Sequence, residues 1–147
     1  MGRDLTLHRA TGPDLRAEDL YALLRLRSEV FVVEQACAYL DPDGQDLTDG
    51  TLHLWFTDPT GAVASSVRVL AEPGGGSRIG RVVTAPVFRG RGLAGRLVDE
   101  ALAVAERPVV LHAQSHLVGV YARHGFVPDG DEYVEDGIPH TPMRLAR

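Results

Sequence analysis

The stretch from Ile79 to Ala105, IGRVVTAPVFRGRGLAGRLVDEALAVA, constrains the fold of this chain more than any other part of it. Val82 and Val83 are β-branched and favour a strand, which Pro86 ends because proline has no N–H to give to a ladder. After a glycine-rich loop, apolar residues recur at helical spacing: Leu93, Leu97, Val98, Ala101, Leu102 and Ala105. The stretch therefore predicts a strand, a loop and a helix in direct succession.

The loop in the middle of this stretch lies at the N-terminus of the predicted helix. The first backbone N–H groups of a helix have no partner within it, and the helix dipole places about half a positive charge there. Glycines in the loop let its backbone approach a ligand closely, and three arginines add fixed positive charge: Arg89, Arg91 and Arg96. These features predict a phosphate-binding site.

Gly90, Gly92 and Gly95 also spell the G-x-G-x-x-G of dinucleotide-binding proteins, although a lone match is weak evidence. In a Rossmann unit the first glycine follows the strand almost directly, and an acidic residue about 20 positions further on binds the ribose. Here Pro86 intervenes, and the next predicted strand, Val109 to Ala113, ends without an acid. The chain also contains no lysine, which excludes a P-loop. A nucleotide-dependent oxidoreductase is therefore disfavoured.

Periodicity along the rest of the chain predicts an α/β protein with a mixed sheet. A parallel pairing is expected between the strands at 78–84 and 109–113, because a crossover helix joins them. The predicted order is β-α-β-β-β-α-β-α-β-β, in one domain spanning residues 1–147. The other predicted elements are a strand near Leu5 to His8, a helix at 15–31, strands at 51–57 and 62–71, a helix at 115–124, and closing strands near 132–135 and 141–145.

The segment from Glu34 to Gly50 is polar and rich in turn residues, and it carries four aspartates: Asp41, Asp43, Asp46 and Asp49. A calcium site is one interpretation, but in an EF-hand the order is D-x-D-x-[DN]-G, whereas here a glycine follows the second aspartate directly. We therefore expect this acidic loop to be solvated or to face a substrate, and we expect no metal.

The charge of the chain limits its partners. A formal net charge of −5 and a pI near 5.6 disfavour nucleic acid and anionic membranes, and they suit a cationic substrate. The single Cys37 has no partner for an internal disulfide, and no signal peptide or membrane-spanning segment is apparent. We expect a cytoplasmic protein, either a monomer or a homodimer.

Two motifs resemble the GCN5-related N-acetyltransferase (GNAT) superfamily. The run from Thr84 to Ala94, TAPVFRGRGLA, is similar to the family's motif A, and the run QSHLVGVYARHGF resembles its second helix, with Tyr121 four residues before Gly125-Phe126. Other short segments and residues resemble the ElaA-like subgroup: VFVVEQ at 30–35, Tyr39, Asp43-Gly44, and DGIPH at 136–140.

This resemblance implies the GNAT acyl-CoA N-acyltransferase fold and acetyl-CoA as co-substrate. It implies that the backbone of Val82, Val83 and Thr84 pairs with the pantetheine arm. The pyrophosphate would be held by the loop residues Arg89, Gly90, Arg91, Gly92, Leu93, Ala94 and Gly95, and Gln114 stands where the family usually has a cofactor-binding asparagine.

The same resemblance implies transfer of an acetyl group to a primary amine, with Tyr121 as general acid. Glu34 and His53 are our candidates for the base. Gln35, Tyr39 and His140 are candidates for binding the acceptor amine. Two other classes stay open: a GNAT-fold module that binds CoA or acyl-CoA without turnover, and a hydrolase built on Ser115, His116 and His112, which lacks the G-x-S-x-G elbow.

Overall fold

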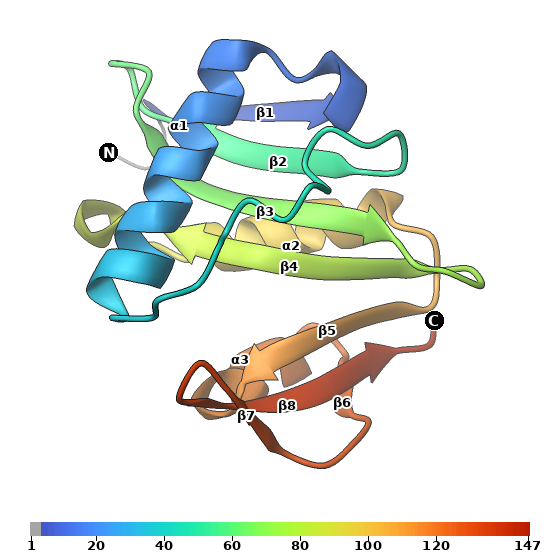
Figure 1. Cartoon of the computed structure of the whole chain (residues 1–147). Coiled ribbons are helices and arrows are strands. Elements are labelled where there is room, and N and C mark those ends of the chain that lie inside the picture. The colour runs from blue at the N-terminus through green and yellow to red at the C-terminus, as the bar shows by residue number, and fades with distance from the viewer. Residues whose placement is uncertain (1–3) are drawn as a thin grey trace.

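An eight-stranded mixed sheet forms the framework of the protein, and its strands lie in the order β1-β2-β3-β4-β5-β8-β6, with β7 paired to β8 (Figure 1). The computed structural model describes residues 4–147. The strands are β1 (Thr6–Thr11), β2 (Leu52–Thr57), β3 (Val63–Ala71), β4 (Ser77–Thr84), β5 (Val109–Gln114), β6 (Val127–Pro128), β7 (Tyr133–Glu135) and β8 (Ile138–Leu145). The predicted parallel pair of β4 and β5 is confirmed, and the other pairs are antiparallel.

Helices cover both faces of this sheet (Figure 1). On one face lies α1 (Ala17–Arg27), followed by a π-helical segment, Ser28–Glu34. On the other face lie α2 (Leu93–Val104) and the short α3 (Val118–Ala122). The predicted helix after the glycine loop is confirmed as α2, because its apolar stripe is buried: Leu93, Leu97, Val98 and Ala101. That stripe packs on the main core, which β2, β3, β4 and β5 complete with Leu54, Phe56, Val67, Ile79 and Leu111.

The strands β4 and β5 separate soon after they meet. Their ladder consists of Ser77 opposite Val109 and Arg78 opposite Val110. Beyond this point β4 carries an irregularity, because its register against β3 shifts between Ser66 and Arg68 and Arg81 adopts a φ of 52°, in the left-handed region. A non-glycine residue rarely takes that conformation, so the surrounding contacts must hold it there. Among residues 4–147, no strand pairs with the edge of β4 from Ile79 to Thr84 on the β5 side.

Three elements differ from the sequence-based expectations. The first helix is α-helical only to Arg27, and its continuation is π-helical, with Gln35 N–H bonded to Val30 C=O at 3.0 Å. The run VFVV falls in that segment, and β-branched side chains crowd an α-helix. The two-residue β6 was not predicted, since Pro128 leaves little strand pattern to detect. The last strand begins at Ile138 rather than near residue 141.

Candidate active site

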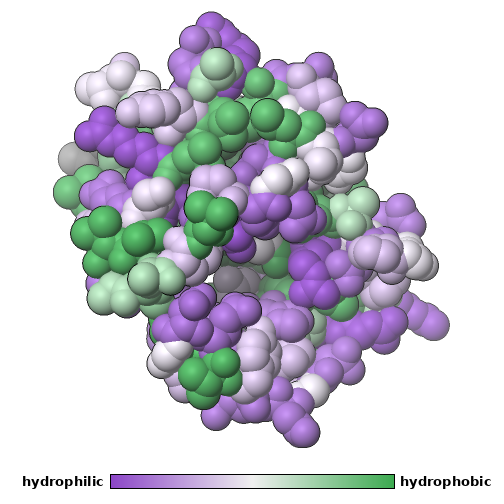
Figure 2. Space-filling model, in the orientation of Figure 1, coloured by the Kyte–Doolittle hydropathy of each residue, from purple (hydrophilic) through white to green (hydrophobic). Residues whose placement is uncertain are grey.

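A cleft of about 470 Å³ opens where β4 and β5 separate. In the view of Figure 2 the surface is hollowed between the α1 and β4 side of the molecule and the β5 and β8 side. Residues from the π-helical segment, the acidic loop, β4, β5, α3, β7 and β8 line it. The cleft therefore collects most of the predicted site residues, which lie far apart in the sequence.

The glycine and arginine loop lies beside this cleft and leads into α2. Gly90 and Gly92 have φ values of 80° and 71°, which glycine adopts without strain, and Gly92 is the N-cap of α2. The first backbone bond of the helix runs from Arg96 N–H to Gly92 C=O at 3.1 Å, so the amides before Arg96 are free of the helix ladder. A Cβ built on Gly90 or Gly92 would meet nothing within 4 Å. The loop backbone thus faces open space, as a phosphate site requires.

Arg89 of this loop is tied to the end of the π-helical segment. Its guanidinium donates two hydrogen bonds to the Glu34 carboxylate, at 2.6 and 2.8 Å, and one to the Thr84 carbonyl at 3.2 Å. The hydrogen bond from Arg89 lowers the pKa of Glu34, and Glu34 in turn raises the pKa of Arg89. Glu34 is thereby held ionised beside the cleft rather than left as a free base. Arg89 lines the cleft, and Arg91 stacks on the Phe88 ring instead, 5.3 Å from its centroid.

Tyr121 projects from α3 into the floor of the cleft. Its ring is 9% exposed and packs edge-on against Phe126, with centroids 6.3 Å apart. Burial raises the pKa of its hydroxyl to about 12. Tyr121 is therefore a neutral phenol throughout the physiological pH range, and the structure shows no hydrogen-bond partner for its hydroxyl within residues 4–147. It keeps a proton that it can donate to an anion arriving in the cleft.

The other predicted donor-side residues lie on the two separated strands. Val82, Val83 and Thr84 line the cleft from β4, although the Val83 side chain is buried against Leu26 and Val30 beneath α1. On the opposite wall, Gln114 ends β5 and also lines the cleft. Its amide donates a hydrogen bond to Gln35 at 3.3 Å. Backbone groups of β4 and the amide of Gln114 thus face each other across the opening.

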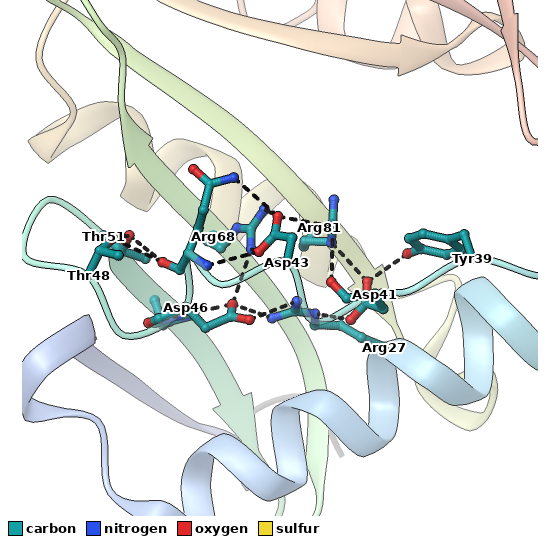
Figure 3. A network of polar contacts seen from close by, with 11 residues as sticks. Arg27, Tyr39, Asp41, Asp43, Asp46, Thr48, Thr51, Arg68 and Arg81 are labelled. Atoms are coloured by element: carbon teal, nitrogen blue, oxygen red, sulfur yellow. Dashed lines mark hydrogen bonds and ion pairs between the residues drawn. The ribbon is translucent and has the colours of Figure 1, made fainter.

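The acidic loop corrects one part of our expectation, because two of its aspartates are not solvated, although Gln35 and Tyr39 of the same segment line the cleft. Asp41 and Asp46 are 1% and 6% exposed, and they form a buried network with Arg27 of α1 (Figure 3). The Arg27 guanidinium donates to Asp41 at 2.8 Å and to both oxygens of Asp46 at 2.7 and 3.2 Å. Arg68 of β3 donates to Asp46 at 3.2 Å.

The network continues from the buried core toward the cleft (Figure 3). Arg68 also binds Asp43, at 2.8 and 2.9 Å. Arg81 of β4 then pairs with Asp41 at 2.8 Å and with Asp43 at 3.3 Å. We call these residues the arginine–aspartate network: Arg27, Asp41, Asp43, Asp46, Arg68 and Arg81. It fixes the acidic loop against α1, β3 and β4, and it accounts for the unusual backbone of Arg81.

Three further residues that the sequence predicted for the site contact this network or line the β8 side of the cleft: Tyr39, His53 and His140. Tyr39 lines the cleft, donates its hydroxyl to Asp41 at 2.6 Å and lies under the Arg81 guanidinium. Burial and the neighbouring Asp41 raise its pKa. His140 lines the cleft from β8, and its Nδ1 bonds the Ile138 carbonyl at 2.7 Å. His53, by contrast, is 2% exposed on β2, bonds the Asp46 carbonyl at 2.8 Å and does not line the cleft.

The cleft also contains residues that were not among those predicted for the acetyltransferase site, and His112 was a candidate only for the hydrolase alternative. His112 of β5, Tyr133 and Glu135 of β7, and Arg81 all line it. The sequence carried a signal for His112, because it alternates with Leu111 and Ala113, which are buried on the opposite face of β5. Tyr133 and Glu135 lie two residues apart on a predicted strand and so share one of its faces, but Val134 between them is exposed. Nothing in the sequence indicates, however, that these two strands meet at one cleft.

Comparison with known proteins identifies the family. The model of the acetyltransferase (GNAT) domain matches residues 14–147. The chain belongs to the GNAT superfamily. Among curated relatives, a UPF0039 protein of Mycobacterium tuberculosis is 50% identical over 141 residues, covering 93% of this chain and 90% of the relative. Protein ElaA of Escherichia coli is 41% identical over 142 residues, covering 88% and 89%. These relatives place the chain in the ElaA-like subgroup, as the motifs predicted.

Solved structures agree on the fold. An acyl-CoA N-acyltransferase from Pseudomonas aeruginosa has a TM-score of 0.90 at 42% identity, covering 97% of this chain and 99% of its own. The crystal structure of E. coli ElaA has a TM-score of 0.88 at 35% identity, covering 95% and 98%. The predicted GNAT acyl-CoA N-acyltransferase fold is confirmed, and the family relation supports an acyltransferase. In the part of the chain that the structure describes, no helix combines the length and apolar character needed to cross a bilayer.

Proposed function

We propose that this protein is an acetyl-CoA-dependent N-acetyltransferase that transfers an acetyl group to a primary amine by direct attack, with Tyr121 as general acid. The observation that carries the proposal is the convergence of three features on one cleft. These are the unpaired edge of β4, the glycine loop that opens α2, and the buried neutral hydroxyl of Tyr121. Each serves a different requirement of thioester aminolysis.

The donor is held in this proposal by backbone groups more than by side chains. The pantetheine arm lies along Val82, Val83 and Thr84 as an added strand, because that edge of β4 has no partner there. The pyrophosphate lies on the free amides that open α2, where Arg89 supplies charge. Gln114 faces the same opening from β5. Glu34 keeps Arg89 oriented until a phosphate replaces its carboxylate as a partner.

Acetyl transfer requires a neutral amine, because an alkyl ammonium has no lone pair. With a pKa of about 10.4, forming the free amine at pH 7 costs about 4–5 kcal/mol. The amine nitrogen attacks the thioester carbonyl carbon, and a C–N bond forms while the C–S bond breaks. The nitrogen loses its second proton as the C–N bond forms, the bonding pair leaves on sulfur, and Tyr121 donates its proton to that thiolate. The Tyr121 phenolate left behind is a stronger base than the thiolate, since a thiol has a pKa of about 8.5 and Tyr121 one of about 12. The phenolate therefore regains a proton from solvent.

The acceptor enters from the wall opposite α3 in this proposal. Gln35, Tyr39 and His140 line that part of the cleft and offer an amide, a phenol ring and an imidazole. The neighbouring carboxylates Glu135 and Asp136 also line it. These two carboxylates offer partners for a cationic amine beside the arginines that also line the cleft, Arg68, Arg78, Arg81 and Arg89. A neighbour that shares only the fold, a spermidine N-acetyltransferase from Vibrio cholerae, was solved with CoA and spermine.

The test begins with calorimetric titration of acetyl-CoA, with NAD and ATP as controls, and continues with free-thiol release from acetyl-CoA over a panel of amines. The panel includes n-butylamine, spermine and a peptide with a free N-terminus. Selective binding with turnover supports the enzyme. Selective binding without turnover of any amine supports the alternative of a non-catalytic acyl-CoA-binding module, and equal binding of NAD contradicts the donor site.

The variant Tyr121→Phe then tests the general acid. We expect unchanged acetyl-CoA affinity and a kcat about 10² to 10⁴-fold lower, because only the proton donor is removed. Tyr21→Phe is the matched control, since Tyr21 is 72% exposed on α1 and outside the cleft. A Tyr121→Phe variant with the wild-type kcat removes Tyr121 from the mechanism.

A further inference from the structure

One wall of the cleft carries a chain of aromatic side chains from three strands. His112 is on β5, Tyr133 on β7 and His140 on β8, and the three lie on neighbouring strands because β8 pairs with both β5 and β7. Tyr133 is directly opposite His140 in the β7–β8 ladder. Leu111 and Ala113, on either side of His112, are buried in the main core, so the imidazole points to the other face of the sheet.

The orientation of the His112 ring is fixed at one nitrogen only. Its Nδ1 forms a short hydrogen bond with the Tyr133 hydroxyl, and the two rings meet edge-on at 5.5 Å and 73°. Tyr133 in turn stacks on His140 at 5.7 Å and 25°, and His140 bonds the Ile138 carbonyl. Within residues 4–147 the structure gives the Nε2 of His112 no hydrogen-bond partner. The imidazole is therefore held by Nδ1 while Nε2 is left for a ligand.

The charges around His112 favour its neutral form. Burial lowers its pKa, and the Arg78 guanidinium on β4 lowers it further. Glu135 on β7 and Glu72 in the turn before β4 raise the pKa of His112, and His140 lowers it. Arg78 stays in place because Glu72 accepts two hydrogen bonds from it, at 2.9 and 3.0 Å. At pH 7 the imidazole is thus mostly unprotonated and able to accept a proton.

We propose that His112 is the general base of the reaction, with Nδ1–H donated to the Tyr133 hydroxyl and with Nε2 facing the acceptor amine; this rests on the acetyltransferase function proposed above. Tyr133 is a positioning residue, because its hydroxyl holds the ring at Nδ1 and can accept a hydrogen bond from Nδ1–H, which leaves the lone pair on Nε2. The arrangement is that of a base oriented by a third group.

The amine nitrogen gives up two protons during this reaction. The ammonium first loses one proton to water, and the free amine attacks the thioester carbon. As the C–N bond forms, the nitrogen becomes acidic and its second proton passes to His112 Nε2. The C–S bond breaks, Tyr121 protonates the sulfur, and His112 and Tyr121 exchange protons with solvent. The sum is an amide, CoA thiol and one proton released.

The two bases suggested by the sequence are less suited to this role. Glu34 is held ionised in a two-point ion pair with Arg89, and its pKa is lowered, so it is a weak proton acceptor. His53 is buried in β2, bonds the Asp46 carbonyl and lies outside the cleft lining. His112 combines access to the cleft, a neutral ring and an unengaged nitrogen.

The test compares His112→Gln with His116→Gln, a nearby exposed histidine outside the cleft lining. We expect His112→Gln to lower kcat/KM about 10² to 10⁴-fold at pH 7 with acetyl-CoA affinity unchanged, and His116→Gln to act like the wild type. The wild-type pH profile is expected to bend with an apparent pKa below about 6.5, and this bend disappears in His112→Gln. The assay uses whichever amine of the panel turns over, with n-butylamine as the first probe.

A second measurement reads the proposed site without turnover. Nitrogen-15 NMR of the imidazoles is expected to show the Nδ1–H tautomer at His112 in the wild type and a shift toward Nε2–H in Tyr133→Phe. Wild-type kinetics in His112→Gln, or an Nε2–H tautomer in the wild type, overturns the assignment of His112 alone. Absence of turnover with every amine instead overturns the acetyltransferase function, and the base assignment with it.

Discussion

Replacing Arg27 by methionine removes a buried charge from the centre of the arginine–aspartate network. Arg27 is 2% exposed and makes three hydrogen bonds, one to Asp41 and two to Asp46. Methionine keeps most of the aliphatic packing but supplies no donor. The two aspartates then remain in a buried site with less positive charge, which is the costly outcome of breaking an ion pair from one side.

The structure sets the size of this effect. Removing one partner of a buried pair costs about 3–5 kcal/mol. Asp41 keeps Arg81 and the Tyr39 hydroxyl, and Asp46 keeps Arg68, so the lower half of that range applies. We expect a loss of about 3–4 kcal/mol in the free energy of unfolding, and since each kcal/mol lowers Tm by about 2–4 °C at this chain length, a Tm lower by about 10 °C. A domain of ordinary stability of about 5–15 kcal/mol stays folded.

Urea denaturation followed by fluorescence measures this loss, because Trp55 is the single tryptophan and is 3% exposed on β2. Arg78→Met is the matched control for stability, since it breaks a two-point ion pair with Glu72 whose side chains are 35% and 26% exposed. Such a partly solvated pair contributes about 0–1 kcal/mol. If Arg27→Met is destabilised no more than Arg78→Met, the network does not hold the acidic loop as argued here.

The pH dependence of the free energy of unfolding gives a second test of the same network. Burial opposes ionisation of Asp46, but the hydrogen bonds and charges of Arg27 and Arg68 outweigh it and lower its pKa. A carboxyl whose pKa is lower in the folded state stabilises fully above its unfolded pKa of about 3.9, and this contribution is lost as pH falls through the folded value. Wild-type stability should therefore fall as pH drops below about 4. Arg27→Met should show a shallower dependence in that window.

Two further substitutions test the turn before β4 and the loop beside the cleft. Gly76→Ala places a Cβ in conflict with the Pro108 carbonyl oxygen at a φ of 88°, and we expect urea denaturation to show a loss above about 2 kcal/mol in the free energy of unfolding. Gly61→Ala has the same φ of 88° but no such conflict with residues 4–147, and it should lose only about 1–2 kcal/mol. Arg89→Gln should raise the Kd for acetyl-CoA measured by calorimetry about 10-fold, with little change in stability to urea. The control Arg123→Gln, at an exposed position, should leave both quantities unchanged. Equal affinities in the two variants would remove Arg89 from the pyrophosphate site.

The donor half of the proposed site rests on signals that are local in the sequence. Glycines, arginines and the apolar stripe of α2 occupy one continuous stretch, and the chemistry of a helix N-terminus depends on little else. The strand pattern around it was equally local, so the parallel pairing of β4 and β5 followed from the crossover helix. What the pattern did not show is how soon the two strands separate, because that depends on the contacts of Arg81 with a loop 40 residues away.

The acidic loop shows why the acceptor half was harder to predict. Its aspartates suggested a solvated loop. Their partners lie on α1, β3 and β4, and a single sequence does not indicate which charged residues will meet in the fold. A weaker signal was nonetheless present in Arg68. It interrupts the apolar run AVASSVRVLA at a position that is 3% exposed, and a charge is rarely buried in such a strand without a partner. Such an arginine predicts an acidic partner somewhere in the chain.

The network connects the two halves of the proposed site through one residue. Arg81 lies on the donor strand β4, in a left-handed conformation that costs about 1–2 kcal/mol, and its side chain is held by Asp41 and Asp43 of the acidic loop. The same Asp41 accepts the hydroxyl of Tyr39, which faces the acceptor side of the cleft. A change that releases the acidic loop therefore removes the support of the β4 irregularity and the anchor of Tyr39 together. Arg27→Met, although its side chain lies outside the cleft, should for this reason weaken both acetyl-CoA binding and acceptor binding, whereas a purely local role in stability would leave the Kd and KM of the folded variant unchanged.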